Sequence, residues 1–159
     1  MLDLLQNDEV QRLLLMNKDG LLFAIWETLY TTVISTFFAY VIGLPLGVLA
    51  VVGEPGGVLP LPRPVMAVLN IVINILRSVP FLILMVMVIP LSRLIVGTSI
   101  GTVATIVPLI VAAFPFVARL VEASLREVDK GVVEAAQSMG CTPFQIISKV
   151  MIPESRPSL

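Results

Sequence analysis

Histidine is absent from the 159-residue sequence, and cysteine occurs once, as Cys141. Without histidine the chain lacks the commonest metal ligand and the usual general base of nucleophilic catalysis. A single cysteine cannot form a disulfide within the chain. The phosphate-binding pattern GxxxxGK followed by Ser or Thr is also missing. These absences argue against an enzyme, and we expect no cofactor and no metal; any work driven by ATP would need a separate ATPase polypeptide.

Charged residues are scarce as well. They make up 13% of the sequence, against 57% hydrophobic residues, and the mean hydropathy is +1.01; an average soluble domain carries about 25% charged residues. The formal net charge of -1 and the scattered basic residues give no nucleic-acid-binding footprint. A soluble core of this size could not bury so much apolar surface, so the composition predicts an all-α, polytopic helical membrane protein.

Three apolar runs predict three transmembrane helices. Thr28 to Gly53 is a run of 26 residues without a charge, longer than the roughly 20 that a spanning helix needs. The Gly- and Pro-rich stretch 53–64 ends it. In Val65 to Ser92 the only charge is Arg77; as one helix this run would be about 42 Å long, so part of it must tilt or project from a core of about 30 Å. Leu94 to Ala118 forms the third run.

These runs divide the chain into an amphipathic leader (1–20), three spans (21–118) and a cytoplasmic segment (119–159). The leader is acidic, unlike a cleavable signal peptide, so we expect it to be retained. Positive residues favour the cytoplasmic side of a membrane. One side carries Arg63, Arg119, Arg126, Lys130, Lys149 and Arg156, and the other carries Arg12, Lys18 and Arg93. The N-terminus is therefore predicted to face outward and the segment 119–159 to face the cytoplasm.

The cytoplasmic segment contains signals for two short helices. Asp129 can cap a helix that begins near Lys130, and Gly140 is the residue type that most readily adopts the left-handed conformation at a helix end. Thr142 and Gln145 have the spacing of a capping box. Pro153 is predicted to stop the second helix. The first position of this helix is Pro143, and one apolar face is predicted to carry Phe144, Ile147, Val150 and Met151.

Local physics leaves two interpretations of this segment open. Small residues, among them Ala135, Ala136, Ser138 and Gly140, lie beside an apolar helix face, which suits a docking surface for another protein. The same amphipathic helix could instead rest on lipid headgroups.

The stretch "EAAQSMGCTPFQIISKVMIP", residues 134–153, resembles the EAA signature of permease subunits of ATP-binding-cassette importers. Val150 and Ile152 stand where that family usually has isoleucine and leucine. The resemblance implies that the segment forms coupling helices, which seat in a groove on the ATPase subunit. The residues implied in coupling are Glu134, Ala135, Ala136, Gly140, Cys141, Thr142, Pro143, Phe144, Ile152 and Pro153.

Five further stretches resemble the methionine-uptake permease subfamily: "WETLYTTVIS" (26–35), "VIGLPLGV" (41–48), "NILRSVPFLIL" (74–84), "SRLIVGTSIG" (92–101) and "PFVARLVE" (115–122). This resemblance implies a permease of the bacterial cytoplasmic (inner) membrane that imports an amino acid, methionine above all. It also implies separate ABC ATPase subunits, an extracytoplasmic substrate-binding protein and a second permease copy as partners. Members of the family have five spans, so we expect that the last two are missing here.

Polar residues within the spans have competing interpretations. Asn70, Asn74 and Arg77 share one stripe of the second run, which suits packing between helices, snorkelling of the arginine to the membrane edge, or a translocation path. Gly43 and Gly47 form a small-xxx-small pair that favours close helix packing. The charged residues Arg119, Glu122 and Arg126 are most simply the solvated end of the third span.

A second function of a different class is a structural or anchoring membrane protein with an interfacial amphipathic tail. That alternative predicts that the tail tolerates a scrambled order if its amphipathic character is kept. The importer predicts loss of activity on scrambling.

Overall fold

The computed structural model describes residues 20–155, so the predicted leader, apart from Gly20, lies outside the described residues. Within the described range every regular element is helical, which confirms the all-α membrane class. The elements are α3 (Leu21–Val52), α4 (Arg63–Ser78), α5 (Phe81–Val96), α6 (Thr102–Arg126), α7 (Lys130–Ser138), α8 (Pro143–Ile146), the π-helical turn η1 (Ile147–Met151) and α9 (Ile152–Glu154).

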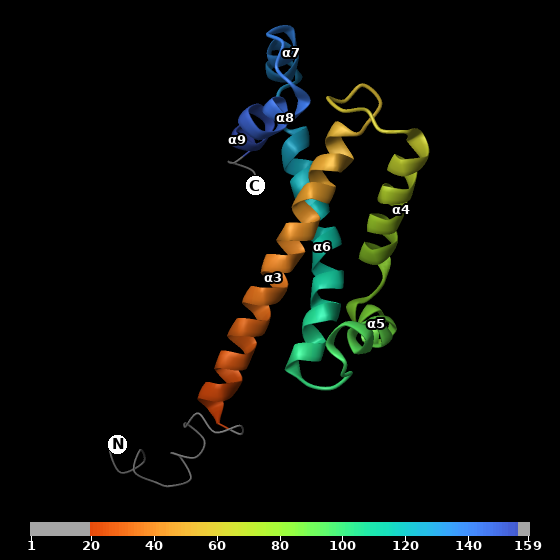
Figure 1. Ribbon diagram of the computed structural model, residues 1–159, viewed down its shortest axis with the longest axis vertical. Helices are drawn as coiled ribbons and strands as arrows, with labels where there is room; N and C mark the ends of the chain where they lie inside the picture. The colour runs from red at the N-terminus through yellow and green to blue at the C-terminus, as the bar shows by residue number, and fades with distance from the viewer. Residues whose placement is uncertain (1–19, 156–159) are drawn as a thin grey trace, which may run out of the picture.

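Two of these helices, α3 and α6, are each long and apolar enough to cross a membrane. The pair α4 and α5 passes the same test only when joined, and its two halves are bent by 116°. The described residues thus hold two candidate spans, or three if the bent pair counts as one. Figure 1 shows α3 and α6 side by side, α4 and α5 beyond them, and α7 to α9 at the far end of α6.

The second apolar run does not form the continuous helix that we expected. Pro80 is the reason, because proline disfavours helical angles at the residue before it and cannot donate to the preceding turn. Val79 accordingly has extended backbone angles, with φ of -79° and ψ of 127°. The run is therefore a broken element, and the third span starts at Thr102 rather than Leu94, after Gly97 has ended α5 in the left-handed conformation, with φ of 81°.

The contact between α3 and α6 is a close backbone approach along a stripe of small residues. A side chain at Gly43 would lie 2.7 Å from the carbonyl oxygen of Phe114, and one at Gly47 would lie 2.5 Å from that of Ala118. This confirms the predicted packing role of the two glycines. The stripe repeats every four residues and is buried throughout, comprising Thr31, Ser35, Ala39, Gly43 and Gly47.

Polar contacts fix both ends of this helix pair. Near the start of α3, the hydroxyl of Thr102 donates to the carboxylate of Glu27. Beyond the end of α3, Arg126 donates to the carboxylate of Glu54 at 2.5 Å. Because small residues fill the interval, α3 and α6 form one packed unit that supports the helices α7 to α9.

Candidate coupling site

The segment after α6, residues 127–155, folds into two helical arms joined at a corner, which we call the elbow. The first arm is α7, and the second runs from α8 through η1 to α9. The carboxylate of Asp129 accepts from the backbone N–H of Gly131 at 2.6 Å and so caps α7. At the other end of α7, Gly140 has φ of 78°. The N–H of Gly140 donates to the carbonyl of Gln137 and the N–H of Cys141 to that of Ala136, the two bonds of a Schellman motif. These observations confirm the predicted cap and the predicted corner at Gly140.

The second arm of the elbow begins with a complete capping box. The backbone N–H of Thr142 donates to the side-chain oxygen of Gln145 at 2.9 Å, and the N–H of Gln145 donates to the hydroxyl of Thr142 at 3.4 Å. Pro143 occupies the first turn, where its missing N–H costs nothing. The predicted start of this helix is therefore confirmed.

The end of this arm differs from the prediction. The helix passes through Pro153 and ends at Glu154, with a π-helical turn at Ile147–Met151. In this wider turn the N–H of Ile152 donates to the carbonyl of Ile147, five residues earlier. Proline in a helix clashes with the carbonyl four residues before it. The wider register at Ile147–Met151 accommodates the ring of Pro153 without ending the helix.

The buried face of the elbow is anchored on the α3–α6 pair. Ile146 and Met151 have 1% and 4% of their surfaces exposed, and they belong to the same apolar cluster as Val52 of α3 and Val121 of α6. Ile147 and Val150, two residues of the predicted apolar face, pack against this cluster, a contact with the spans that we did not predict. Phe144 does not: 78% of its surface is exposed. The predicted apolar face is therefore divided, because Phe144, in the first turn of the arm, does not share the buried surroundings of the other three residues.

The elbow tip, comprising Met139, Gly140, Cys141 and Phe144, has the opposite character. Met139 and Phe144 have 82% and 78% of their surfaces exposed, and a side chain added at Gly140 would meet no atom within 4 Å other than those of its two chain neighbours. Cys141, by contrast, is half-buried and packs against the cluster that anchors the elbow. Sequence reasoning missed Met139, since nothing in its local pattern distinguishes an exposed methionine from a buried one.

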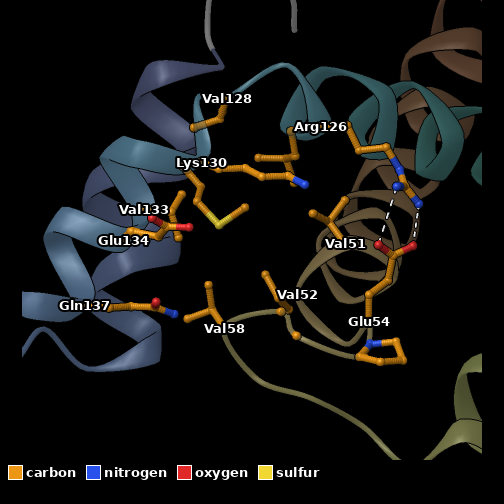
Figure 2. A pocket seen from close by; sticks show the side chains of 15 residues that line it. Val51, Val52, Glu54, Val58, Arg126, Val128, Lys130, Val133, Glu134 and Gln137 are labelled. Atoms are coloured by element: carbon orange, nitrogen blue, oxygen red, sulfur yellow. Dashed lines mark hydrogen bonds and ion pairs between the residues drawn. The ribbon is translucent and has the colours of Figure 1, made fainter.

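The other predicted coupling residues are distributed around the elbow. Ala136 is buried, with 7% of its surface exposed, and it packs in the cluster that anchors the elbow. Glu134 and Ala135 are exposed, as are Thr142 and Pro143, whereas Ile152 and Pro153 are half-buried. Glu134 lines a cavity of about 610 Å³ between α7, the loop after α3 and the end of α6. Figure 2 shows Lys130, Glu134 and Gln137 on one side of this cavity, across from Glu54 and Arg126.

A charge cluster centred on the buried Glu122 adjoins the elbow, and the sequence did not predict this burial. We expected Glu122 at a solvated helix end, but only 5% of its surface is exposed. It pairs with Arg119 and with Arg126, the latter at 3.0 Å. Arg126 also pairs with Glu54. The spacing of these residues on one helix was visible in the sequence, but the burial of Glu122 depends on the tertiary contacts of α6.

Two members of the predicted polar stripe join this cluster. Arg119 donates to the side-chain oxygens of Asn70 and Asn74, at 3.2 and 2.7 Å. These bonds link α4 to α6. Arg77, the third member, is exposed in the last turn of α4. The structure thus brings Asn70 and Asn74 together at an interhelix contact and leaves Arg77 outside it.

Comparison with known proteins agrees with this architecture. Residues 43–159 match the family of binding-protein-dependent transport system inner membrane components. This match covers more than half of the chain, and the chain therefore belongs to that family. Transport by such systems depends on a binding protein by the family's own description.

Individual relatives narrow the similarity to D-methionine permeases. The chain is 53% identical over 144 residues to the probable D-methionine transport system permease protein MetI of Vibrio cholerae serotype O1, and 51% identical over 135 residues to D-methionine transport system permease protein MetI of Escherichia coli K12. The alignments cover 91% and 85% of this chain but 64% and 62% of these relatives. The chain thus spans slightly less than two thirds of their length.

Solved structures show the same relationship. The crystal structure of inward-facing conformations of the MetNI methionine ABC transporter matches with a TM-score of 0.83 and 50% identity, over 87% of this chain and 64% of that one. An amino acid ABC transporter crystallised with histidines matches with a TM-score of 0.55 and 25% identity, over 82% of this chain and 58% of that one. These matches confirm the resemblance that the EAA stretch and the span motifs had indicated.

Proposed function

We propose that the chain is the permease subunit of an ATP-driven importer that moves an amino acid, methionine above all, across the cytoplasmic membrane. In this proposal separate ABC ATPase subunits hydrolyse ATP, an extracytoplasmic binding protein delivers the substrate, and two permease copies form the path. The start of α3 faces outward and the elbow faces the cytoplasm. Support for methionine comes from the relatives named above, and support for the coupling mechanism comes from the elbow.

The single observation that carries the proposal is the contrast between the two sides of the elbow. Its inner face, including Ile146 and Met151, is buried against α3 and α6, while its tip presents Met139 and Phe144 to solvent. Large apolar side chains that project from a rigid turn suit a pocket in a partner protein. The tip would receive the movement of the ATPase and the buried face would pass it to the spans.

In this mechanism ATP binding closes the ATPase dimer, and the docked tips move with it. The elbow moves as a rigid body because its caps satisfy the backbone groups at both helix ends and its inner face is packed. The displacement reaches α3 and α6 and exchanges the inward-facing and outward-facing states. The chain's own part in the reaction is to bind, support and move, and no covalent step occurs on it.

The alternative of an interfacial anchor fits the elbow less well. A helix that rests on lipid must present its apolar face to the membrane. Here the main apolar face is already covered by α3 and α6, which leaves Val132 of α7 and the tip residues Met139 and Phe144 as the exposed large apolar side chains of the elbow. Three apolar side chains offer little area for stable membrane binding, but the two at the tip are sufficient to anchor a protein contact.

Replacing Phe144 by alanine tests the docking role. We expect the affinity for the ATPase to fall by about 30-fold, which corresponds to about 2 kcal/mol for loss of an aromatic anchor. Folding should be unaffected, because most of the Phe144 surface contacts nothing within the chain. The measurement is the amount of ATPase that co-purifies with the permease at matched expression, together with ATP-dependent methionine uptake.

Leu82→Ala is a matched control, since Leu82 lies in α5, far from the elbow in the chain, with 74% of its surface exposed. It should retain the ATPase. Equal retention of the ATPase by Phe144→Ala and Leu82→Ala would show that the tip is not the docking surface. If the wild-type permease retains the ATPase but shows no methionine uptake, the assignment of methionine as the substrate is refuted instead.

A further inference from the structure

Glu122 is a buried acid that the coupling mechanism above does not use. Its side chain is 7% exposed and lies in α6, one of the apolar spans. Burying a carboxylate is costly unless its charge is paired. Glu122 meets this requirement with two arginines of its own helix: Arg119 pairs with one carboxylate oxygen, and Arg126 donates to the other at 3.0 and 3.3 Å.

Each of these arginines also contacts a different part of the fold. Arg119 donates to Asn74 at 2.7 Å and to Asn70 at 3.2 Å, both on α4. Arg126 donates to Glu54 at 2.5 Å, in the loop after α3. Glu122 orients both guanidinium groups, because each must satisfy Glu122 and its outside partner together. One carboxylate therefore connects α4, α6 and the end of α3.

This hydrogen-bonded network lies between the elbow and the bent helix pair α4–α5. Arg126 is the last residue of α6, and Asp129, three residues later, caps α7. Asn74 lies one turn before the end of α4, where the chain turns by 116° into α5. A displacement of α7 reaches Arg126 first, and the network then offers a polar route to α4. Few apolar residues of α4 are buried, with only Met66 and Ile73 in this class, so α4 depends on such contacts.

We propose that Glu122 is a positioning residue that passes the movement of the elbow to α4. This inference rests on the proposed transport function and adds a specific route to it. The charge of Glu122 keeps Arg119 turned toward Asn70 and Asn74, so α4 follows α6 when the elbow moves. Without that charge Arg119 is released, and α6 moves without α4.

The test is Glu122→Gln in the permease assembled with its ATPase and binding protein. Glutamine keeps the shape of the side chain and removes its charge. We expect methionine uptake per ATP hydrolysed to fall about tenfold, within the usual range of coupling between sites, while ATP hydrolysis per assembled complex persists. A purely structural role would lower both rates together through the amount of complex and would leave their ratio unchanged.

Glu127→Gln is the matched control, because Glu127 is an exposed glutamate immediately after α6. It should keep the wild-type ratio. If Glu122→Gln does not assemble, Asn74→Ala decides the question: it removes the shorter of the two hydrogen bonds that Arg119 makes to α4, at an exposed position, and should lower the same ratio.

A wild-type ratio in the assembled Glu122→Gln complex, or in Asn74→Ala where the first variant does not assemble, overturns this inference and leaves the proposed function intact. Absence of ATP-dependent uptake by the wild-type complex would count against the proposed function itself. The two failures are therefore distinguishable in one experiment.

Discussion

Replacing Gly47 by leucine is expected to prevent stable packing of α3 against α6. Even the first carbon of a new side chain would lie 2.5 Å from the carbonyl oxygen of Ala118 and 2.7 Å from Cβ of Val121. Neither contact can be relieved by rotating a side chain, because one partner is backbone and the other is fixed to it. We expect a loss of at least about 3 kcal/mol, the upper end of the usual cost of overpacking.

The measurement is thermal unfolding of the purified chain in detergent, together with the yield of folded protein. Ala24→Leu is the control, since it adds a large side chain at an exposed position of the same helix. Gly47→Ala should lie between the two variants. Equal stability of Gly47→Leu and Ala24→Leu would contradict the close approach of the two helices.

Replacing Gly140 by tryptophan is expected to abolish transport. The residue has φ of 78°, which costs a side chain about 1–2 kcal/mol, and the indole would project into open space at the elbow tip. Because the site has no neighbours within 4 Å, the chain should still fold. Docking should weaken by about 30-fold or more, as for loss of an interface anchor. The readouts are ATPase co-purification and methionine uptake.

Gly97→Trp separates backbone strain from docking. Gly97 ends α5 with φ of 81° and also has no atom within 4 Å of its missing side chain. The two variants therefore carry the same local strain at opposite ends of the fold. We expect Gly97→Trp to retain the ATPase and Gly140→Trp to lose it. Equal loss in both variants would attribute the effect to strain rather than to the coupling surface.

Features with local causes were predictable from the sequence. The caps at Asp129 and Thr142 and the left-handed Gly140 depend on residues within a few positions of each other, and all three are present in the structure. The contact of Gly43 and Gly47 was predictable for a similar reason, since their spacing aligns them on one helix face. Apolar composition alone was sufficient to indicate helices in a membrane.

Features that depend on tertiary contacts were not predictable in the same way. The burial of Glu122 follows from the packing of α6 against two other parts of the chain, which its spacing does not reveal. The packing of Ile147, Val150 and Met151 against the spans, with Phe144 left exposed, also depends on tertiary contacts, so the predicted apolar face did not reveal it. The break at Val79 was predictable, because its cause, Pro80, is visible in the sequence. We gave more weight to the length of the apolar run than to this proline.

Cross-linking from Cys141 is the most direct test of the central claim that the elbow tip docks on an ATPase. Cys141 is the only cysteine in the 159-residue sequence and is half-buried at the tip, so a thiol-specific photoreactive probe labels one place within these residues. In the assembled complex the account predicts covalent adducts between this residue and the ATPase subunit. Adducts with phospholipid alone would contradict it.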